Sequence, residues 1–247
     1  MLLSHRLPPF SLPAKADYGY QYDTELEGYH VYLPQGGKLF YKEAIFNDET
    51  SLELIAYFTA NNTFPSFPIH WHQQLHADTL AQIFWKNIAW QQDQIKLFGK
   101  EMLVPRLSAW YGDAHAQYTY SGLTLQPKAW NEGLLFIKEK VEYFAKTPFN
   151  SVLMNWYRNG QDSMGWHADD EKELGKNPVI ASINFGATRR FLMRNKADNS
   201  QKLEIHLTNG TLLIMKGTTQ HHWQHAVPKE PKIQRSRFNL TFRYILP

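Results

Sequence analysis

The 247-residue sequence contains no cysteine, which excludes both disulfide bonds and thiolate metal sites. It has no run of 18 or more apolar residues, so we expect no membrane-spanning helix and no membrane partner. The first residues lack a charged segment followed by a long apolar run. We therefore expect no signal peptide and an intracellular protein, cytoplasmic or, in a eukaryote, nuclear. The formal net charge is only +3, which permits a nucleic-acid partner without requiring one.

A folded core is expected, because 43% of the residues are hydrophobic and 15% are aromatic. The length allows one large domain or one domain with an extension. We expect residues 1–90 to form an N-terminal extension packed on a main domain of residues 91–247. Prolines and glycines predict irregular structure over residues 1–38, and the tyrosines there favour contact with the main domain.

Hydrophobic spacing predicts the helices. A strand within residues 39–46 is followed by a helix that Asp48 would cap. Residues 131–146 carry one apolar stripe and predict a second, structural helix. Residues 70–90 are weakly helical. They contain three histidines at metal-like spacing, for which surface or packed histidines are the better interpretation: His70, His72 and His76.

Short strands predominate in the rest of the chain. Residues 95–104 predict a β-hairpin with its tip near Phe98. After residue 146, glycine, Asn-Gly and proline turns separate short segments with strand character: 152–157, 180–185, 190–194, 203–207, 211–215, 222–227 and 238–245. Many short strands with such turns indicate a sandwich, a barrel or a jelly roll. The predicted fold class is therefore mainly β with flanking helices (α+β).

A candidate metal site begins at His167-Ala168-Asp169. Positions two apart lie on the same side of an extended backbone, so His167 and Asp169 can face one ion. A third ligand must come from a distant strand, where the sequence alone leaves His221 and His225 as competitors on one strand face. Two imidazoles and one carboxylate leave coordination positions open, which is typical of non-haem Fe(II) oxygenases.

The strand predicted over residues 238–245, extended back to residue 237, alternates polar and apolar side chains. Its polar face carries Arg237, Asn239, Thr241 and Arg243. A polar row inside a barrel is costly unless it serves a ligand, and a guanidinium can bind a carboxylate through two parallel hydrogen bonds. Asn155 and Tyr157 show the same alternation on an earlier strand. The alternative is an amphipathic edge strand with solvated arginines.

These motifs resemble those of the AlkB family of Fe(II)- and 2-oxoglutarate-dependent dioxygenases. The similarity covers roughly residues 95–247. It rests on Asn155-x-Tyr157, His167-x-Asp169, His225-x-Val227-Pro228 and the stretch from Arg237 to Arg243. Pro105-Arg106, Tyr111-Gly112-Asp113 and Ser121-Gly122-Leu123 resemble the branch of the family that repairs nucleic acid. The first ninety or so residues show no clear match.

The resemblance implies a double-stranded β-helix, or jelly roll, as the core. It favours His225 over His221, because the family's distal ligand lies three residues before a proline. Fe(II) would then be held by His167, Asp169 and His225. The residues implied for 2-oxoglutarate are Asn155, Tyr157, Arg237, Thr241 and Arg243, and O2 is the other cosubstrate.

The resemblance also implies contacts with a substrate base. Asp170 and Glu171 would approach its exocyclic amine, a hydrogen-bond donor; two solvated acids starting a helical turn are the alternative. Tyr118, Tyr120 and Ser121 match the stretch that covers a flipped base, where aromatic stacking is useful; core packing is the alternative for them.

The predicted hairpin at residues 95–104 resembles the flipping hairpin of duplex-preferring repair enzymes. Phe98 would fill the gap that a flipped base leaves, or else pack against the domain. Lys96, Lys100 and Arg106 could hold the flanking phosphates. We therefore expect nucleotide-recognition hairpins within residues 91–125.

The activity implied is oxidative demethylation of N-alkylated bases, such as 1-methyladenine and 3-methylcytosine, in DNA or RNA. It would convert 2-oxoglutarate to succinate and release formaldehyde. A demethylase or hydroxylase of RNA or protein is one alternative, and a jelly-roll protein that holds a metal without turnover is another. The expected partner is alkylated nucleic acid, bound by a monomer.

Overall fold

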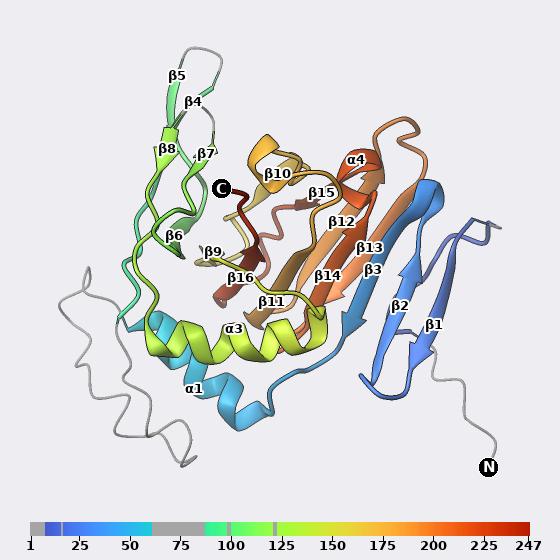
Figure 1. Cartoon of the computed structure of the whole chain (residues 1–247), viewed down its shortest axis with the longest axis horizontal. Helices are drawn as coiled ribbons and strands as arrows, with labels where there is room; N and C mark the ends of the chain where they lie inside the picture. Colours follow the sequence, from blue (N-terminus) through green and yellow to red (C-terminus); the bar gives the residue numbers. More distant parts are fainter. Residues whose placement is uncertain (1–7, 16, 61–86, 98–99, 121–122) are drawn as a thin grey trace.

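Two antiparallel sheets build the computed structural model, which describes residues 8–15, 17–60, 87–97, 100–120 and 123–247 (Figure 1). Within these residues, the larger sheet has eight strands in the order β1-β2-β3-β14-β11-β16-β9-β6. The smaller sheet has four strands in the order β10-β15-β12-β13. The predicted class, mainly β with flanking helices around a jelly-roll core, is confirmed.

The strands predicted after residue 146 are all present, with ends that shift by at most two residues. The strand β10, which carries His167, is an addition to them. The larger sheet consists of β1 (Gly19–Asp23), β2 (Gly28–Tyr32), β3 (Gly37–Lys42), β6 (Leu107–Gly112), β9 (Ser151–Tyr157), β11 (Ile180–Gly186), β14 (Leu212–Gly217) and β16 (Arg237–Arg243). The smaller sheet consists of β10 (Met164–His167), β12 (Arg189–Asn195), β13 (Lys202–Leu207) and β15 (Trp223–Val227).

The prediction of irregular structure is wrong for residues 19–38, whereas the described residues before Gly19 contain no helix or strand. β1 and β2 form a hairpin, and β3 joins it to β14 in the larger sheet. The turn-forming residues connect these strands rather than prevent them: Pro34 begins a short 3-10 turn between β2 and β3. Inside β2, Gly28 allows close packing, because a Cβ there would lie 2.5 Å from the ring of Phe40. Tyr29 is buried beneath the rings of Tyr20 and Tyr22.

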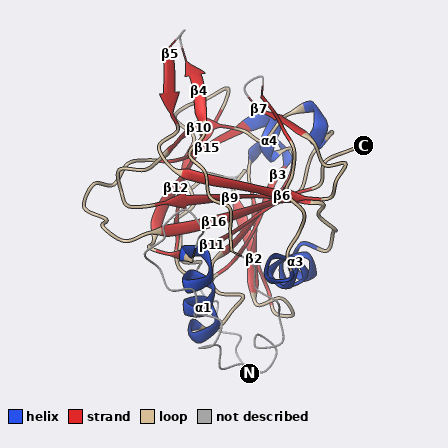
Figure 2. Ribbon diagram, turned by 90° about the vertical axis from the view of Figure 1, so that its left-hand side faces the viewer, coloured by secondary structure: helices blue, strands red, loops and turns tan. Residues whose placement is uncertain are grey.

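Side-chain alternation along the strands separates two hydrophobic cores. In β16, Phe238, Leu240 and Phe242 are fully buried in the core between the larger sheet and its helices. Figure 2 shows α1 and α3 together on that side of the sheet. The second core lies between the two sheets and includes Phe191 and Trp223. The polar face of β16 is thereby directed between the sheets.

The helices agree with the predicted segments at α1 and α3. They are α1 (Asp48–Thr59), α3 (Glu132–Ala145) and the short α4 (Thr219–His222), with 3-10 turns at Pro34–Gly36 and Lys172–Leu174. Asn47 caps α1 by accepting the Thr50 N–H at 2.8 Å, so the predicted cap, Asp48, is instead the first helical residue. In the described part of the chain, no helix has the length and apolar character needed to span a membrane.

Two hairpins extend from the body at the top of Figure 1. The predicted hairpin is confirmed as β4 (Gln94–Leu97) paired with β5 (Lys100–Leu103). Beside it, β7 (Tyr118–Tyr120) pairs with β8 (Leu123–Leu125). Phe98 lies outside the described residues, as do His70, His72 and His76 with most of the helix predicted there.

Candidate active site

A cavity opens between the two sheets, and the predicted site residues meet in it. Strands of both sheets line it, with the polar face of β16 on one side and β10 and β15 on the other. Its polar lining residues are Asn155, Tyr157, His167, Asp169, Ser182, His225, Arg237, Asn239, Thr241 and Arg243. The predicted cosubstrate set and the predicted metal set therefore share one cavity.

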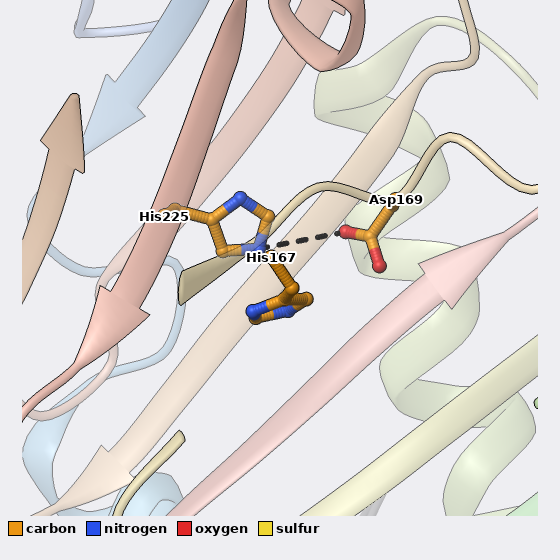
Figure 3. A group of neighbouring side chains, drawn as sticks. All are labelled: His167, Asp169 and His225. Atoms are coloured by element: carbon orange, nitrogen blue, oxygen red, sulfur yellow. Dashed lines mark ion pairs between the residues drawn. The ribbon is translucent and has the colours of Figure 1, made fainter. Parts of the chain in front are cut away.

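The metal set is a compact cluster (Figure 3). The potential ligand atoms of His167, Asp169 and His225 all lie within 4.8 Å of one another. The two imidazole ring centroids are 4.2 Å apart, and Nε2 of His225 lies 3.7 Å from Oδ2 of Asp169. This convergence arises because β10 pairs with β15 so that His167 is directly opposite His225. Asp169 follows just after β10 ends.

Neighbouring groups orient this cluster. Nδ1 of His167 lies 2.9 Å from the carbonyl oxygen of Gly165, so Nδ1–H can donate there and leave Nε2 for a metal. The side-chain oxygen of Gln220 accepts the backbone N–H of Asp169 at 2.9 Å. The ring of Phe191 stacks on His225 with centroids 5.2 Å apart.

The charge states of the cluster suit metal binding. Burial alone would raise the pKa of Asp169, but the charge of Arg243 and the two nearby histidines outweigh it and lower the pKa to about 2. Burial, aided by His167, lowers the pKa of His225 to about 3. A carboxylate and a neutral imidazole are the forms in which these side chains ligate a metal.

The competition between the two histidines has a structural answer. His221 and His222 belong to α4, so His221 does not share a strand face with His225 as the sequence suggested. His221 is exposed, whereas His225 is buried beside Asp169. Among the described residues, the cluster contains His225 and not His221.

The two arginines of β16 are both buried, and they have different surroundings. Arg243 donates from Nη2 to Oδ1 of Asp169, so it lies at the metal cluster. Arg237 lies with its guanidinium carbon 4.8 Å from the ring centroid of Tyr157, and it donates to Oδ1 of Asn184. Burial lowers the pKa of Arg237. A cation in such a place is stabilised by an anion.

Polar atoms in the cavity lack partners that a ligand would supply. Oδ2 of Asp169 is buried and has no hydrogen-bond partner in the described part of the chain. The same holds for Nε and Nη1 of Arg237. Orphaned buried groups cost free energy, so a cation at the first and a carboxylate at the second would satisfy the site. These residues therefore suit Fe(II) and 2-oxoglutarate.

Asn155 and Arg106 are joined inside the protein. Arg106 is only 6% exposed, and its Nε donates to Oδ1 of Asn155 at 2.7 Å. A buried arginine in this position orients a residue of the cosubstrate set. The predicted phosphate contact of Arg106 stays a prediction, and its burial argues against it.

Two further polar residues line the cavity that the predicted site set did not include. Asn239 donates through Nδ2 to Oγ of Ser182 at 2.7 Å, and Thr241 donates to Oδ1 of Asn239 at 3.0 Å. The alternation of β16 already placed Asn239 on the polar face. Ser182 and Asn184 show a shorter version of the same alternation on β11, with Ile183 and Phe185 on the other face, and that signal was not used in the prediction.

The two predicted base-reading acids differ in environment. Asp170 is exposed and accepts a hydrogen bond from Nζ of Lys196 at 2.8 Å. Oε2 of Glu171 is buried and has no hydrogen-bond partner among the described residues. Tyr118 and Tyr120 belong to β7, whose backbone pairs with β8. Ser121 lies outside the described residues.

Comparisons with known proteins agree with this site. Residues 63–243 match the family model for the 2OG-Fe(II) oxygenase superfamily. The chain is 44% identical over 180 residues to Alpha-ketoglutarate-dependent dioxygenase alkB homolog 3 of Bos taurus, covering 69% of this chain and 62% of that protein. It is 42% identical over 160 residues to DNA oxidative demethylase ALKBH2 of Homo sapiens, covering 62% of this chain and 61% of that protein.

A solved structure, that of OsALKBH1, has a similar fold. It superposes with a TM-score of 0.50 at 16% identity, covering 87% of this chain and 99% of the other. The sequence matches span about three fifths of the length of the curated relatives.

Because the family model spans most of the chain, the protein belongs to the 2OG-Fe(II) oxygenase superfamily. Within it, the chain is of the AlkB type, so the resemblance read from the sequence is confirmed. Membership implies Fe(II) and 2-oxoglutarate as cofactors.

Proposed function

We propose that the protein is an oxidative demethylase of N-alkylated nucleic-acid bases, dependent on Fe(II), 2-oxoglutarate and dioxygen. The observation that carries the proposal is the single cavity in which a His-Asp-His cluster lies beside two buried guanidiniums. Similarity to relatives named as an alkB dioxygenase and a DNA oxidative demethylase supports the substrate class. The intracellular location and monomeric state stay predictions.

His167, Asp169 and His225 would hold the metal, leaving positions for 2-oxoglutarate and dioxygen. When bound, the metal and its cosubstrates supply an oxidative decarboxylation that hydroxylates an N-methyl group, from which formaldehyde then leaves. The protein's part is positioning. Gly165 fixes the tautomer of His167, and Arg243 keeps Asp169 ionised.

Arg237 would bind the carboxylate of 2-oxoglutarate remote from the metal. Its Nε and Nη1 atoms are buried without hydrogen-bond partners among the described residues, and Tyr157 covers its guanidinium. Arg243 would serve the metal end, because it already contacts Asp169. Asn155 and Thr241 complete the predicted set on the same cavity wall.

Glu171 is the better candidate of the two acids for accepting a hydrogen bond from a base amine. Its buried Oε2 has no partner in the described residues, whereas Asp170 is already paired with Lys196. Asp170 would act from the exposed rim, if Lys196 releases it. Tyr118, Tyr120, Ser121 and Phe98 remain proposed substrate contacts.

The test is a turnover panel with the metal-loaded protein. Formaldehyde release and decarboxylation of labelled 2-oxoglutarate are measured together on methylated single-stranded DNA, duplex DNA, RNA and peptides. We expect formaldehyde from 1-methyladenine or 3-methylcytosine in nucleic acid. Release from peptides alone would replace the proposed substrate class. No decarboxylation with any substrate would indicate a protein that holds the metal without turnover.

A further inference from the structure

The outer face of the smaller sheet carries an aromatic and cationic patch that the proposed active site does not use. The pairing of β10 with β15 is irregular between Met164 and His167, so alternation alone does not orient Trp166. Its contact with Arg194, which lies on the less buried face of β12, places the Trp166 side chain on the outer face of the sheet. Trp166 remains 36% exposed, although apolar side chains of its size are usually buried. The guanidinium carbon of Arg194 lies 4.3 Å from the Trp166 ring centroid. We call Trp166, Arg194 and Lys202 the outer patch.

Arg194 is held in place by an uncharged side chain, so no carboxylate neutralises its positive charge. Its Nε and Nη2 both donate to Oε1 of Gln224, at 3.1 and 2.9 Å. Gln224 is directly opposite Arg194 on β15, and Lys202 is directly opposite it on β13. Gln224, Arg194 and Lys202 therefore form a row across β15, β12 and β13, and the fixed guanidinium of Arg194 lies at its centre.

Charge along the outer face is divided unevenly. At the other end of β12, Arg190 is paired with Glu204 and Glu230. Within the described residues, neither Arg194 nor Lys202 forms an ion pair with a carboxylate. The outer patch therefore presents two cations and an indole ring, a combination that suits a phosphate and a nucleobase.

The position of the outer patch points to one partner. β10 is the edge strand of the smaller sheet, and it carries both Trp166 and the candidate ligand His167. A nucleic-acid strand whose alkylated base enters the cavity must continue past the rim of the site. Because Trp166 is next to His167 on this edge strand, the outer patch begins beside the candidate metal site, where the nucleotides adjoining the target base would pass.

We infer that the outer patch is a second contact site for a single nucleic-acid strand. Trp166 would stack on an unpaired base next to the target, and Arg194 and Lys202 would contact the backbone phosphates. The inference rests on the proposed function for its substrate class. It differs from the active site in the residues used and in needing more than one nucleotide.

Binding of an unmodified strand tests the outer patch without turnover. The probe is a fluorescein-labelled single-stranded oligonucleotide of about 15 nucleotides, with anisotropy as the readout. We expect Trp166→Ala to weaken binding about tenfold, since a base stacked on an aromatic ring contributes on that order. Arg194→Gln should weaken binding and lower the slope of log K against log salt by about one.

A matched control is available on the opposite side of the molecule. Tyr143 on α3 is 53% exposed, with Nζ of Lys146 4.4 Å from its ring centroid. Figure 1 shows α3 well away from β10. Tyr143→Ala removes an exposed cation–π pair of similar kind, and we expect wild-type binding. Wild-type affinity in Trp166→Ala and Arg194→Gln as well would overturn the inference.

Turnover separates this inference from the proposed function. We expect Trp166→Ala to lower the ratio of kcat/KM for a methylated oligonucleotide to kcat/KM for a methylated mononucleotide about tenfold. Equal losses on both substrates would mean that Trp166 only supports β10, and would sink the inference. If the wild type demethylates neither substrate, the proposed function fails. Weaker oligonucleotide binding by Trp166→Ala would then still support the outer patch.

Discussion

Charge in the cavity is balanced around one carboxylate. Asp169 is almost fully buried, yet Arg243 and two histidines hold its pKa at about 2. Arg237 lies further along β16, where no carboxylate among the described residues pairs with it. At the Asp169 end of the site, the carboxylate and Arg243 offset each other's charge, which suits a metal. At the Arg237 end, the positive charge has no carboxylate partner among the described residues, which suits an organic anion.

Replacing His225 tests the metal end. We expect His225→Ala to weaken Co(II) binding at least tenfold, because one of three ligands is lost. The d–d absorption of the bound ion measures the binding. His221→Ala is the control, since His221 is exposed on α4. Loss of binding in His221→Ala with retention in His225→Ala would reverse the ligand assignment.

Replacing Arg237 tests the cationic end. Arg237→Ala should weaken the binding of 2-oxoglutarate by about 1.5–3 kcal/mol, because one charge-assisted hydrogen bond is lost. The measurement is the KM for 2-oxoglutarate in its decarboxylation without a nucleic-acid substrate. Arg235→Ala removes an exposed arginine two residues earlier and should leave KM unchanged. We expect Arg243→Ala also to weaken the binding of 2-oxoglutarate. It should weaken metal binding as well, because Arg243 contacts the candidate ligand Asp169. A wild-type KM in Arg237→Ala would contradict the assignment.

Single residues were predictable where a pattern repeats. The alternation of polar and apolar residues predicted one face of β16 that carries Arg237, Asn239, Thr241 and Arg243, and all four line the cavity. Strand parity could not separate His221 from His225, because it assumed one continuous strand where the chain forms α4 first. The hydrogen bond between Arg106 and Asn155 was not predicted, because it is a tertiary contact with no local pattern; the phosphate contact of Arg106 stays a prediction.

At the scale of elements, the caps of the two long helices differ in depth. Asn47 and Asn131 both accept an N-terminal backbone N–H, but Asn47 is exposed and Asn131 is only 8% exposed. Asn131 also accepts a hydrogen bond from the hydroxyl of Tyr57 at 2.8 Å. The α3 cap thereby joins α3 to α1.

The two caps give a paired stability prediction. Asn47→Ala should lower the free energy of unfolding by about 1 kcal/mol, the usual value of a cap. Asn131→Ala should cost about 2–3 kcal/mol, because a buried interhelical hydrogen bond is lost with the cap. Urea unfolding measures both. Equal losses in the two variants would mean that the Tyr57 contact contributes nothing.

The β4–β5 hairpin carries the prediction about duplex substrates. A target base inside a duplex must leave the stack, and an apolar wedge at the tip could fill the space. Phe98→Ala should then reduce demethylation of duplex DNA strongly and of single strands little. Phe98 lies outside the described residues, so parallel assays on the two substrates decide the point. Equal losses on both would leave Phe98 as a packing residue.

Elements were predictable where their own residues determine them. α3 follows from its apolar stripe, and the β4–β5 hairpin follows from two short strands around a glycine. β1 and β2 were missed because proline and glycine in their segment were read as preventing strands, whereas those residues form the connections. Pairing with β3 and β14 stabilises them, and a local pattern does not contain that partner.

At the scale of the whole molecule, the N-terminal strands β1, β2 and β3 continue the larger sheet beyond β14. The proposed division at residue 90 would leave β3 outside the main domain, although β3 pairs along its full length with β14. Deleting residues 1–42 should therefore expose the edge of β14 and reduce soluble yield severely. Deleting residues 1–7, which the structure does not describe, is the control. A soluble, cooperatively unfolding 43–247 fragment would show that the extension is dispensable.

The place of β16 in the sheet has a consequence for biosynthesis. β16 lies between β11 and β9, and every other strand of the larger sheet precedes it in the chain. While the ribosome is still making the polypeptide, β9 and β11 each have an edge that only β16 can cover. Open apolar edges favour association with other chains. The strand that carries both arginines therefore also ends this exposure, so a nascent chain should need chaperone protection until residue 243 is available.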